Sequence, residues 1–280
     1  MINDPGELQS LLSAIMADYQ ADRRFFQTYQ LPEYVVLDDL ACDASGLARF
    51  LTFSVVTNHI HNETNQSKQT AGSQGLWQVC QNLWDYHQWV FEPAQLVGEG
   101  RKDELTTLFG SLELMDNRDP EWWYRTADTL YKHWNGSPQQ LLANPTQAPS
   151  GSPPAAYDAP TIVDAITTHD FPGLSGLKIR PLWLRLMHEE VHELKRIEEI
   201  PIPVDFHIVS ISNRLRGPGY QFEVGDSTDR KTLRHYWQHV AGKIDVPPVI
   251  LDKPLWLLHK YWDNEGEQYV TERLKEIRTD

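Results

Sequence analysis

The sequence predicts an all-α protein, and three observations support this fold class. Apolar residues recur at spacings of three and four through most of the 280-residue chain, which is typical of one buried helix face. No segment alternates regularly between apolar and polar residues, so strands should be few. Hydrophobic residues make up 40% of the chain and charged residues 23%, so the helices can bury a core.

In the amino-terminal half we expect helices over residues 7–30, 44–62, 76–91, 120–134 and 138–142. The first three each carry an apolar stripe with helical spacing. The fourth has Asp119 as its expected N-cap, Pro120 as its first residue and Gly136 as its stop. Ser137 caps the short fifth helix, and the polar residues 61–70 are expected to form a loop.

In the second half we expect helices over residues 161–168, 179–194, 205–215, 228–242 and 254–278. A Pro-Gly turn at residues 171–176 separates the helix expected over residues 161–168 from the one expected over residues 179–194. Residues 144–160 are rich in Pro, Ser, Gly and Ala, which indicates an exposed loop between two halves. We therefore expect two lobes, residues 1–150 and 151–280.

Charge and cysteine content restrict the function classes. The net charge of −14 should repel nucleic acids and acidic membranes, but residues 171–243 hold eleven basic and nine acidic residues and are locally positive. Nucleic-acid binding would therefore be local. Two cysteines exclude a disulfide framework and a four-thiolate iron–sulfur cluster. No apolar run could span a membrane and no secretory signal is present, so we expect a cytoplasmic protein with no membrane partner.

Two short segments of the second half carry the strongest functional signal. The first, Phe171-Pro172-Gly173-Leu174-Ser175-Gly176-Leu177-Lys178-Ile179, is a tight glycine turn between two expected helices. The second, Ile202-Pro203-Val204-Asp205-Phe206-His207-Ile208, opens the next helix, with Ser212-Asn213-Arg214 just after it. Together they resemble the helix–hairpin–helix base-excision DNA glycosylases. Bifunctional members of that family have a lysine two residues after the last hairpin glycine, as in Gly176-Leu177-Lys178, and a Pro-Val-Asp-x-His start to the next helix.

The resemblance covers residues 171–214 and has two departures. The hairpin is one residue longer than in the family, and the interval from Lys178 to Asp205 is also longer. The cysteines of the iron–sulfur branch are missing, which leaves the branch similar to 8-oxoguanine glycosylase/lyases. The resemblance implies a two-lobed helical glycosylase-like fold, in which residues 1–150 complete the fold and residues 151–280 hold the helix–hairpin–helix and the catalytic segment.

The resemblance also implies roles for individual residues. Asp205 and Lys178 correspond to the catalytic pair, and Gly173, Ser175 and Gly176 frame the turn that binds the DNA backbone. His207 is a candidate contact to the base or the duplex. Asn62 is another, because it lies where the family often places a wedge that enters the duplex. No cofactor is expected.

The residue types suit this chemistry. A glycine turn next to a helix N-terminus can direct backbone N–H groups at a phosphate. A lysine in the first turn of a helix is expected to have a lowered pKa, and its neutral amine could form a Schiff base at the anomeric carbon. An aspartate at a helix start can stabilise the oxocarbenium-like charge that develops as a base leaves. Aromatic rings could stack an everted base.

Each of these features taken alone more often has a structural role. A Pro-Gly turn usually connects helices, a lone lysine usually lies in solvent, and an aspartate before a helix is usually its N-cap. The order and neighbourhood of the three features carry the functional interpretation.

A competing motif is His188-Glu189-Glu190-Val191-His192, which matches H-E-x-x-H on an expected helix. At i and i+4 the two histidines could hold zinc, with Glu189 as the general base of a hydrolase. The charged surroundings at residues 193–199 are typical of a solvated helix face. A structural helix that carries two histidines is the preferred interpretation, and no metal is expected.

The resemblance therefore implies a DNA N-glycosylase of base-excision repair that acts on duplex DNA with a damaged base, and in its bifunctional form such an enzyme also has AP-lyase activity. An N-glycosidase acting on a small nucleoside or nucleotide is an alternative that the acidic balance favours. A non-catalytic helix–hairpin–helix binding protein is a further alternative.

Overall fold

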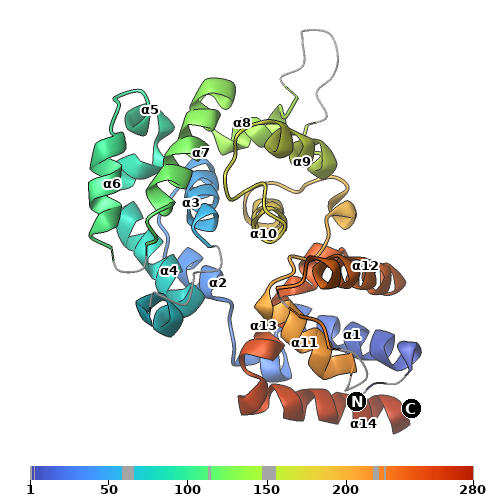
Figure 1. Cartoon of the computed structure of the whole chain (residues 1–280). Coiled ribbons are helices and arrows are strands. Elements are labelled where there is room, and N and C mark those ends of the chain that lie inside the picture. Colours follow the sequence, from blue (N-terminus) through green and yellow to red (C-terminus); the bar gives the residue numbers. More distant parts are fainter. Residues whose placement is uncertain are drawn as a thin grey trace. The chain divides into compact units, whose positions relative to one another are not determined.

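The computed structural model describes residues 2, 4–58, 66–112, 115–146, 156–216, 221–223 and 225–279, with the side chains of 66–71 and 216 left out. The described part of the chain is all-α, with 71% of it helical (Figure 1), as the sequence predicts. Within the described ranges there is no strand; an isolated bridge pairs Asp158 with Lys195. No helix of the described residues is both long and apolar enough to cross a membrane.

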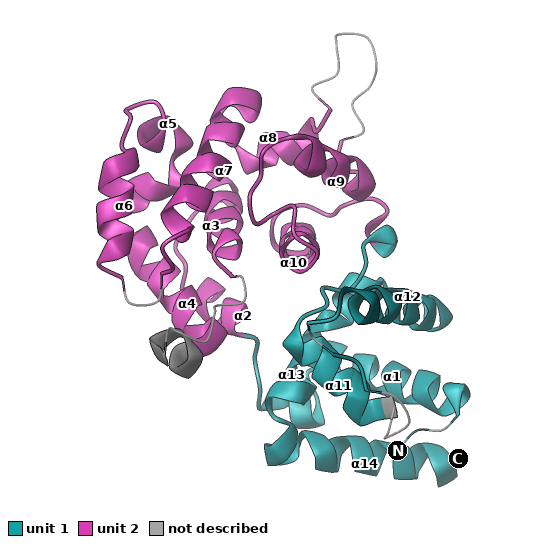
Figure 2. Ribbon diagram, in the orientation of Figure 1, with its two compact units in different colours: residues 1–31, 198–280 teal, residues 32–197 magenta. Residues whose placement is uncertain are grey.

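The chain forms two compact units (Figure 2). One consists of residues 1–31 and 198–280, and the other of residues 32–197. These units do not follow the division expected at residue 150, which falls within residues 147–155, outside the described part of the chain. Local composition could not indicate the observed division, because it depends on pairing between the two ends of the chain.

The unit of residues 32–197 is built around the apolar helix α3. Every residue from Phe50 to Val56 is buried, because α3 packs against α4, α7, α8 and α10. A helix that is apolar all round is stable only inside a core. The helices of this unit are α2 (Pro32–Leu37), α3 (Ala44–Val56), α4 (Gln66–Tyr86), α5 (Pro93–Leu96), α6 (Lys102–Gly110), α7 (Asp119–Trp134), α8 (Pro138–Ala143), α9 (Ala159–Thr168) and α10 (Ile179–Leu186).

The unit of residues 1–31 and 198–280 joins the two ends of the chain. Its helices are α1 (Pro5–Gln20), α11 (Phe206–Arg216), α12 (Ser227–Lys243), α13 (Asp252–Lys260) and α14 (Glu267–Thr279). Helices α1 and α14 lie side by side (Figure 1), and α11 packs along α13. Asp18 of α1 is only 1% exposed and accepts hydrogen bonds from Tyr269 Oη (2.9 Å) and Arg273 Nε (2.8 Å) of α14.

Several expected helix bounds are wrong. The expected helix 7–30 ends at Gln20, and a short 3₁₀ turn (Arg24–Gln27) and α2 follow it. Helix α4 includes Gln66–Thr70, which the sequence indicated as loop, and is interrupted at Gly72. Helices α5 and α6 were not expected, and α7 begins at Asp119 with Arg118 rather than Asp119 as its N-cap.

The expected helix 254–278 is two helices. A π-type turn (Trp262–Gly266) separates α13 from α14. A Cβ at Gly266 would lie 2.8 Å from the carbonyl oxygen of Leu258 and 3.2 Å from that of Tyr261, so the chain can turn this closely only with glycine there. The spacing of apolar residues does not indicate such a close approach of the backbone, so it could not predict this break in the helix.

We predict that Asp18→Asn lowers the free energy of unfolding by about 2–4 kcal/mol, because it removes the charge that compensates the partly buried Arg273. The exposed ion pair between Arg278 and Glu7 joins the same two helices and provides a matched control. Arg278→Gln should cost less than about 1 kcal/mol. Denaturant unfolding measures both changes, and equal losses in the two variants would contradict a dominant role for the buried pair.

Candidate functional site

The turn between α9 and α10 requires glycine at position 173. Gly173 has a φ of +82°, and a Cβ there would lie 3.2 Å from the carbonyl oxygen of Val56 and 3.3 Å from Cε3 of Trp122. Phe171 and Leu174 are buried on either side of it. The turn is therefore pressed against the end of α3 and the start of α7, and its position is set by the core of its unit.

The hairpin uses two of its backbone donors internally. The N–H of Ser175 donates to the carbonyl oxygen of Phe171 (3.1 Å), and the N–H of Gly176 donates to that of Gly173 (2.9 Å). The expectation that successive N–H groups of this turn all point outward to a phosphate is therefore wrong for these two residues. The exposed side chain of Ser175 remains at the surface of the turn, and the phosphate-binding role of Gly173, Ser175 and Gly176 stays a prediction.

The start of α9 is tied to the segment after α10. Asp158 caps α9 by accepting a hydrogen bond from the N–H of Thr161 (3.2 Å), and it pairs with Arg196 (2.7 Å from Nε to Oδ1). Hydrogen bonding from Arg196, followed by the bonds from Thr161, lowers the pKa of Asp158 to about 2. These bonds hold the helix that precedes the hairpin in place.

Lys178 lies at the N-cap of α10, one residue before the helix begins. Its Nζ donates a hydrogen bond to the carbonyl oxygen of Asn58 (3.0 Å), which lies just after α3. The side chain is part-buried rather than extended into solvent. The hairpin, the lysine and the end of α3 thus meet within one unit, and a single N–H of the amine is engaged by this carbonyl.

Asp205 is the N-cap of α11, as the sequence predicts from the Pro-Val-Asp start. Its Oδ1 accepts hydrogen bonds from the backbone N–H groups of His207 (2.8 Å) and Ile208 (3.1 Å). The residue is 8% exposed. Both capping bonds are made by Oδ1. Among the described residues, no hydrogen-bond donor reaches Oδ2, so this second carboxylate oxygen is available for another interaction.

Four rings, from α11 and α13, pack together beside the start of α11. Phe206 is 55% exposed, and its ring meets that of His259 edge-on at 5.2 Å between centroids. The ring of His207 lies 4.6 Å from that of Trp256, with 34° between the planes. Trp256 and His259 come from α13, which packs along α11. Sequence analysis missed both residues of α13, because nothing local in the sequence pairs this helix with the start of α11.

Each predicted site residue is therefore placed within its own unit. Lys178 and the hairpin belong to the unit of residues 32–197, and Asp205 and His207 belong to the unit of residues 1–31 and 198–280. Asn62, the candidate wedge contact, lies outside the described residues.

The H-E-x-x-H alternative does not form a zinc site. Helix α10 ends at Leu186, and a π-type turn (Met187–Val191) leads to His192, which has an extended backbone (φ −162°, ψ 130°). The two histidines therefore do not share the face of one α-helix. Nδ1 of His188 accepts the N–H of Leu194 (2.8 Å), and Glu189 accepts the hydroxyl of Tyr34 (2.5 Å). In the described chain, no three His, Cys, Asp or Glu side chains gather as metal ligands.

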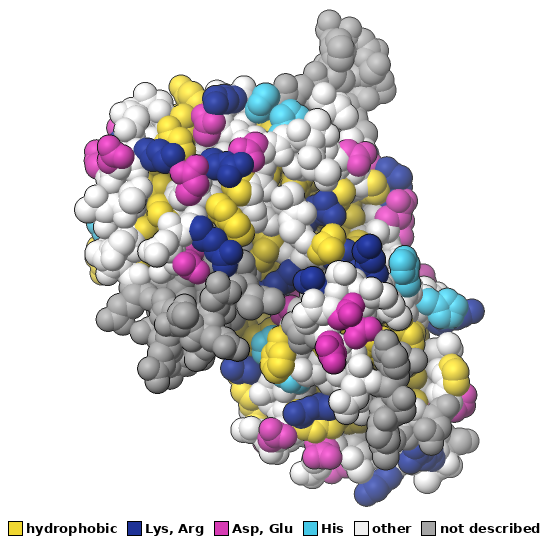
Figure 3. All heavy atoms as spheres, in the orientation of Figure 1, with side chains coloured by type: hydrophobic (Ala, Val, Ile, Leu, Met, Phe, Trp, Pro, Cys, Tyr) yellow, Lys and Arg dark blue, Asp and Glu magenta, His cyan; other side chains and the backbone are white. Residues whose placement is uncertain are grey.

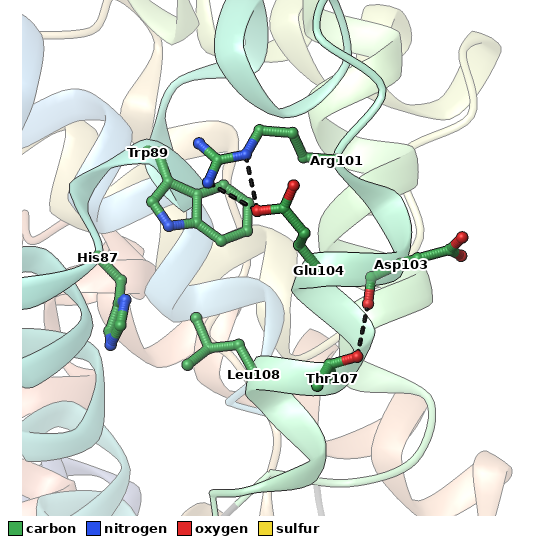
Figure 4. Close-up of a pocket in the computed structure, with 7 residues that line it drawn as sticks. All are labelled: His87, Trp89, Arg101, Asp103, Glu104, Thr107 and Leu108. Atoms are coloured by element: carbon green, nitrogen blue, oxygen red, sulfur yellow. Dashed lines mark hydrogen bonds and ion pairs between the residues drawn. The ribbon is translucent and has the colours of Figure 1, made fainter.

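A separate hollow of about 560 Å³ lies in the unit of residues 32–197 (Figure 4). The guanidinium of Arg101 lies 3.8 Å from the centroid of the Trp89 ring and donates through Nε and Nη2 to one oxygen of Glu104. In Figure 4 these three side chains turn toward one another, whereas Asp103 points away. None of the predicted site residues lines this hollow, so it is not the candidate site.

Comparison with known proteins gives one positive finding. Residues 178–279 match the family model AGOG, described as N-glycosylase/DNA lyase. No curated protein and no solved structure gives a significant match. The match confirms the resemblance to the helix–hairpin–helix glycosylases in this part of the chain. It begins at Lys178 and includes Asp205 and His207, while Gly173, Ser175 and Gly176 precede it.

We predict that Gly173→Ala lowers the free energy of unfolding by about 1–3 kcal/mol, because Cβ would be strained at a positive φ and crowded by Val56 and Trp122. Gly110→Ala in the same unit is the control, since a Cβ there meets nothing within 4 Å. That variant should be neutral or slightly stabilising. Thermal or denaturant unfolding decides between them, and a Gly173→Ala protein as stable as Gly110→Ala would show that the turn is not constrained as described.

Proposed function

We propose, from the likeness of residues 178–279 to N-glycosylase/DNA lyases, that this protein is a DNA N-glycosylase with AP-lyase activity that excises a damaged base. The observation that carries the proposal is the carboxylate of Asp205, inside the matched segment. It is nearly buried and held by its own helix through Oδ1, and within the described chain Oδ2 has no hydrogen-bond donor. A fixed carboxylate with one remaining oxygen can stabilise positive charge that develops on a sugar.

In the proposed reaction, Nζ of Lys178 attacks C1′ of the damaged nucleotide and the C1′–N bond to the base breaks. The base leaves with the electron pair and takes up a proton. Asp205 stabilises the positive charge on C1′ and the ring oxygen as the bond lengthens. Loss of a proton from nitrogen and opening of the sugar ring then give a Schiff base, from which the 3′-phosphate can be eliminated.

The contact of Lys178 fits this role. A neutral amine has two N–H groups and a lone pair, so Nζ can keep its hydrogen bond to the carbonyl oxygen of Asn58 while the lone pair attacks. The bond limits the rotamers of a long side chain, which reduces the entropy lost on reaching the reacting geometry.

The acidic composition of the chain is compatible with a local DNA contact. On the face drawn in Figure 3, Lys and Arg side chains are interspersed with Asp and Glu, and neither sign covers the surface of a unit. With a net charge of −14, the long-range electrostatic interaction with DNA is repulsive, so binding should depend on a few short-range contacts and on salt concentration.

We predict that the wild-type protein releases a base from duplexes that carry single damaged bases, 8-oxoguanine among them, and gives a covalent adduct with borohydride. Lys178→Gln should abolish the adduct because the amine is lost. Asp205→Asn should keep the helix cap and DNA binding but lower the excision rate by about 100-fold or more. Gel analysis of the trapped product and of strand cleavage measures these effects.

Lys132→Gln is a suitable control, because Lys132 is an exposed lysine that pairs with Asp128 on α7. It should form the adduct at the wild-type level. If the wild-type protein gave neither adduct nor base release on any of the lesions, the DNA glycosylase proposal would be rejected.

A second candidate is an N-glycosidase that acts on a free nucleoside or nucleotide. The net charge of −14 favours it, since a small substrate does not require the polyanion contacts of duplex DNA. Release of the base from damaged nucleosides but not from the corresponding duplexes would support this alternative. Duplex binding without any base release would indicate a binding protein instead.

A further inference from the structure

Two histidines form a direct hydrogen bond next to Asp205. Nδ1 of His207, in the first turn of α11, lies 2.8 Å from Nδ1 of His259, near the end of α13. The ring planes are 79° apart, as expected when one ring nitrogen points at the edge of the other ring. Trp256, one turn before His259 on α13, packs on the ring of His207. The His207 ring is thus held by two residues of one helix.

This bond couples the protons of the two rings. At 2.8 Å one Nδ1 must carry a hydrogen and the other must present its lone pair. If His207 becomes an imidazolium, both of its nitrogens carry hydrogens, so its Nδ1–H must donate and His259 must accept. If both rings became charged, two N–H groups would face each other and the bond would break. The pair therefore holds a single extra proton.

The surroundings decide which ring stays neutral. Burial is the largest cause that lowers the pKa of His259 to about 4, followed by the positive charges of His207 and Arg214 on α11. The carboxylates of Asp205 and of Asp263, in the turn after α13, act in the opposite direction and are weaker. Above about pH 4, His259 is thus the neutral ring and can accept the hydrogen bond whenever His207 is protonated.

We propose that His259 is a positioning residue for the Asp205 site: it holds the His207 ring through Nδ1 and stabilises the protonated state of His207. The proposal rests on the proposed function and deepens it. The Asp205 carboxylate acts electrostatically on the ring of His259, which is bonded to the ring of His207. A positive charge on the histidine pair would therefore favour the ionised form of Asp205. Base excision should then depend on the charge of His207.

Two substitutions of His259 separate the hydrogen bond from the presence of a side chain. In His259→Asn, the amide oxygen can take the place of the accepting Nδ1, whereas His259→Leu fills part of the volume and accepts nothing. NMR titration of the His207 ring protons in the full-length protein should give the wild-type midpoint for the Asn variant. The Leu variant should titrate about one to two pH units lower, because the acceptor that stabilises the imidazolium is gone.

The pH profile of kcat/KM for base excision provides the functional readout. In His259→Leu, the limb governed by His207 should move to lower pH by the same interval as the NMR midpoint, and in His259→Asn it should stay in place. An unchanged His207 midpoint in a folded His259→Leu protein would overturn the proposal, as would a shifted midpoint with an unchanged kcat/KM profile. If the wild-type protein excised no base, the proposed function would fail, and the NMR titration would still decide whether the pair exists.

Discussion

The geometry of the candidate site depends on the hydrogen bonds between Asp205 and the first turn of α11. The first N–H groups of a helix have no partner within it, and here Oδ1 of Asp205 accepts two of them. These bonds fix the carboxylate against its own helix and place His207 two residues further on. The capping role and the proposed chemical role therefore belong to different oxygens of one side chain, so the two interpretations of Asp205 are compatible.

Lys178, in the other unit, is positioned by packing rather than by capping. Gly173 brings the hairpin against Val56 and Trp122, and Lys178 then bonds to the carbonyl oxygen of Asn58. The first contact is with the end of α3 and the start of α7, and the second is with Asn58, two residues after α3 ends. Small changes in the core of this unit would thus move the amine, whereas Asp205 responds to the contact between α11 and α13 in the other unit.

The sequence was sufficient where local signals determine the structure. The Pro-Val-Asp sequence predicted where α11 begins and that Asp205 could cap it. Ser137 likewise predicted where α8 begins. It was insufficient where distant groups decide. Helix α10 gives way to a π-type turn after Leu186, next to Arg185, whose buried ion pair is with Glu33, 152 residues away in the chain.

The histidine pair next to Asp205 could not be predicted for the same reason, because it joins residues that are far apart in the sequence. His207 was singled out from its motif, but His259 lies 52 residues away and becomes a neighbour only when α13 packs on α11. The internal hydrogen bonds of the hairpin were also missed, since a Pro-Gly sequence indicates a turn without indicating which of its N–H groups remain available.

Peptide mass spectrometry of the borohydride-trapped DNA adduct tests the central claim most directly, because it identifies the nitrogen that attacks C1′. The account predicts that the modified peptide contains Lys178, and that Asp205→Asn yields less of the same peptide. Modification at another lysine, such as Lys195, or at the amino terminus, with an undiminished adduct in Lys178→Gln, would contradict it.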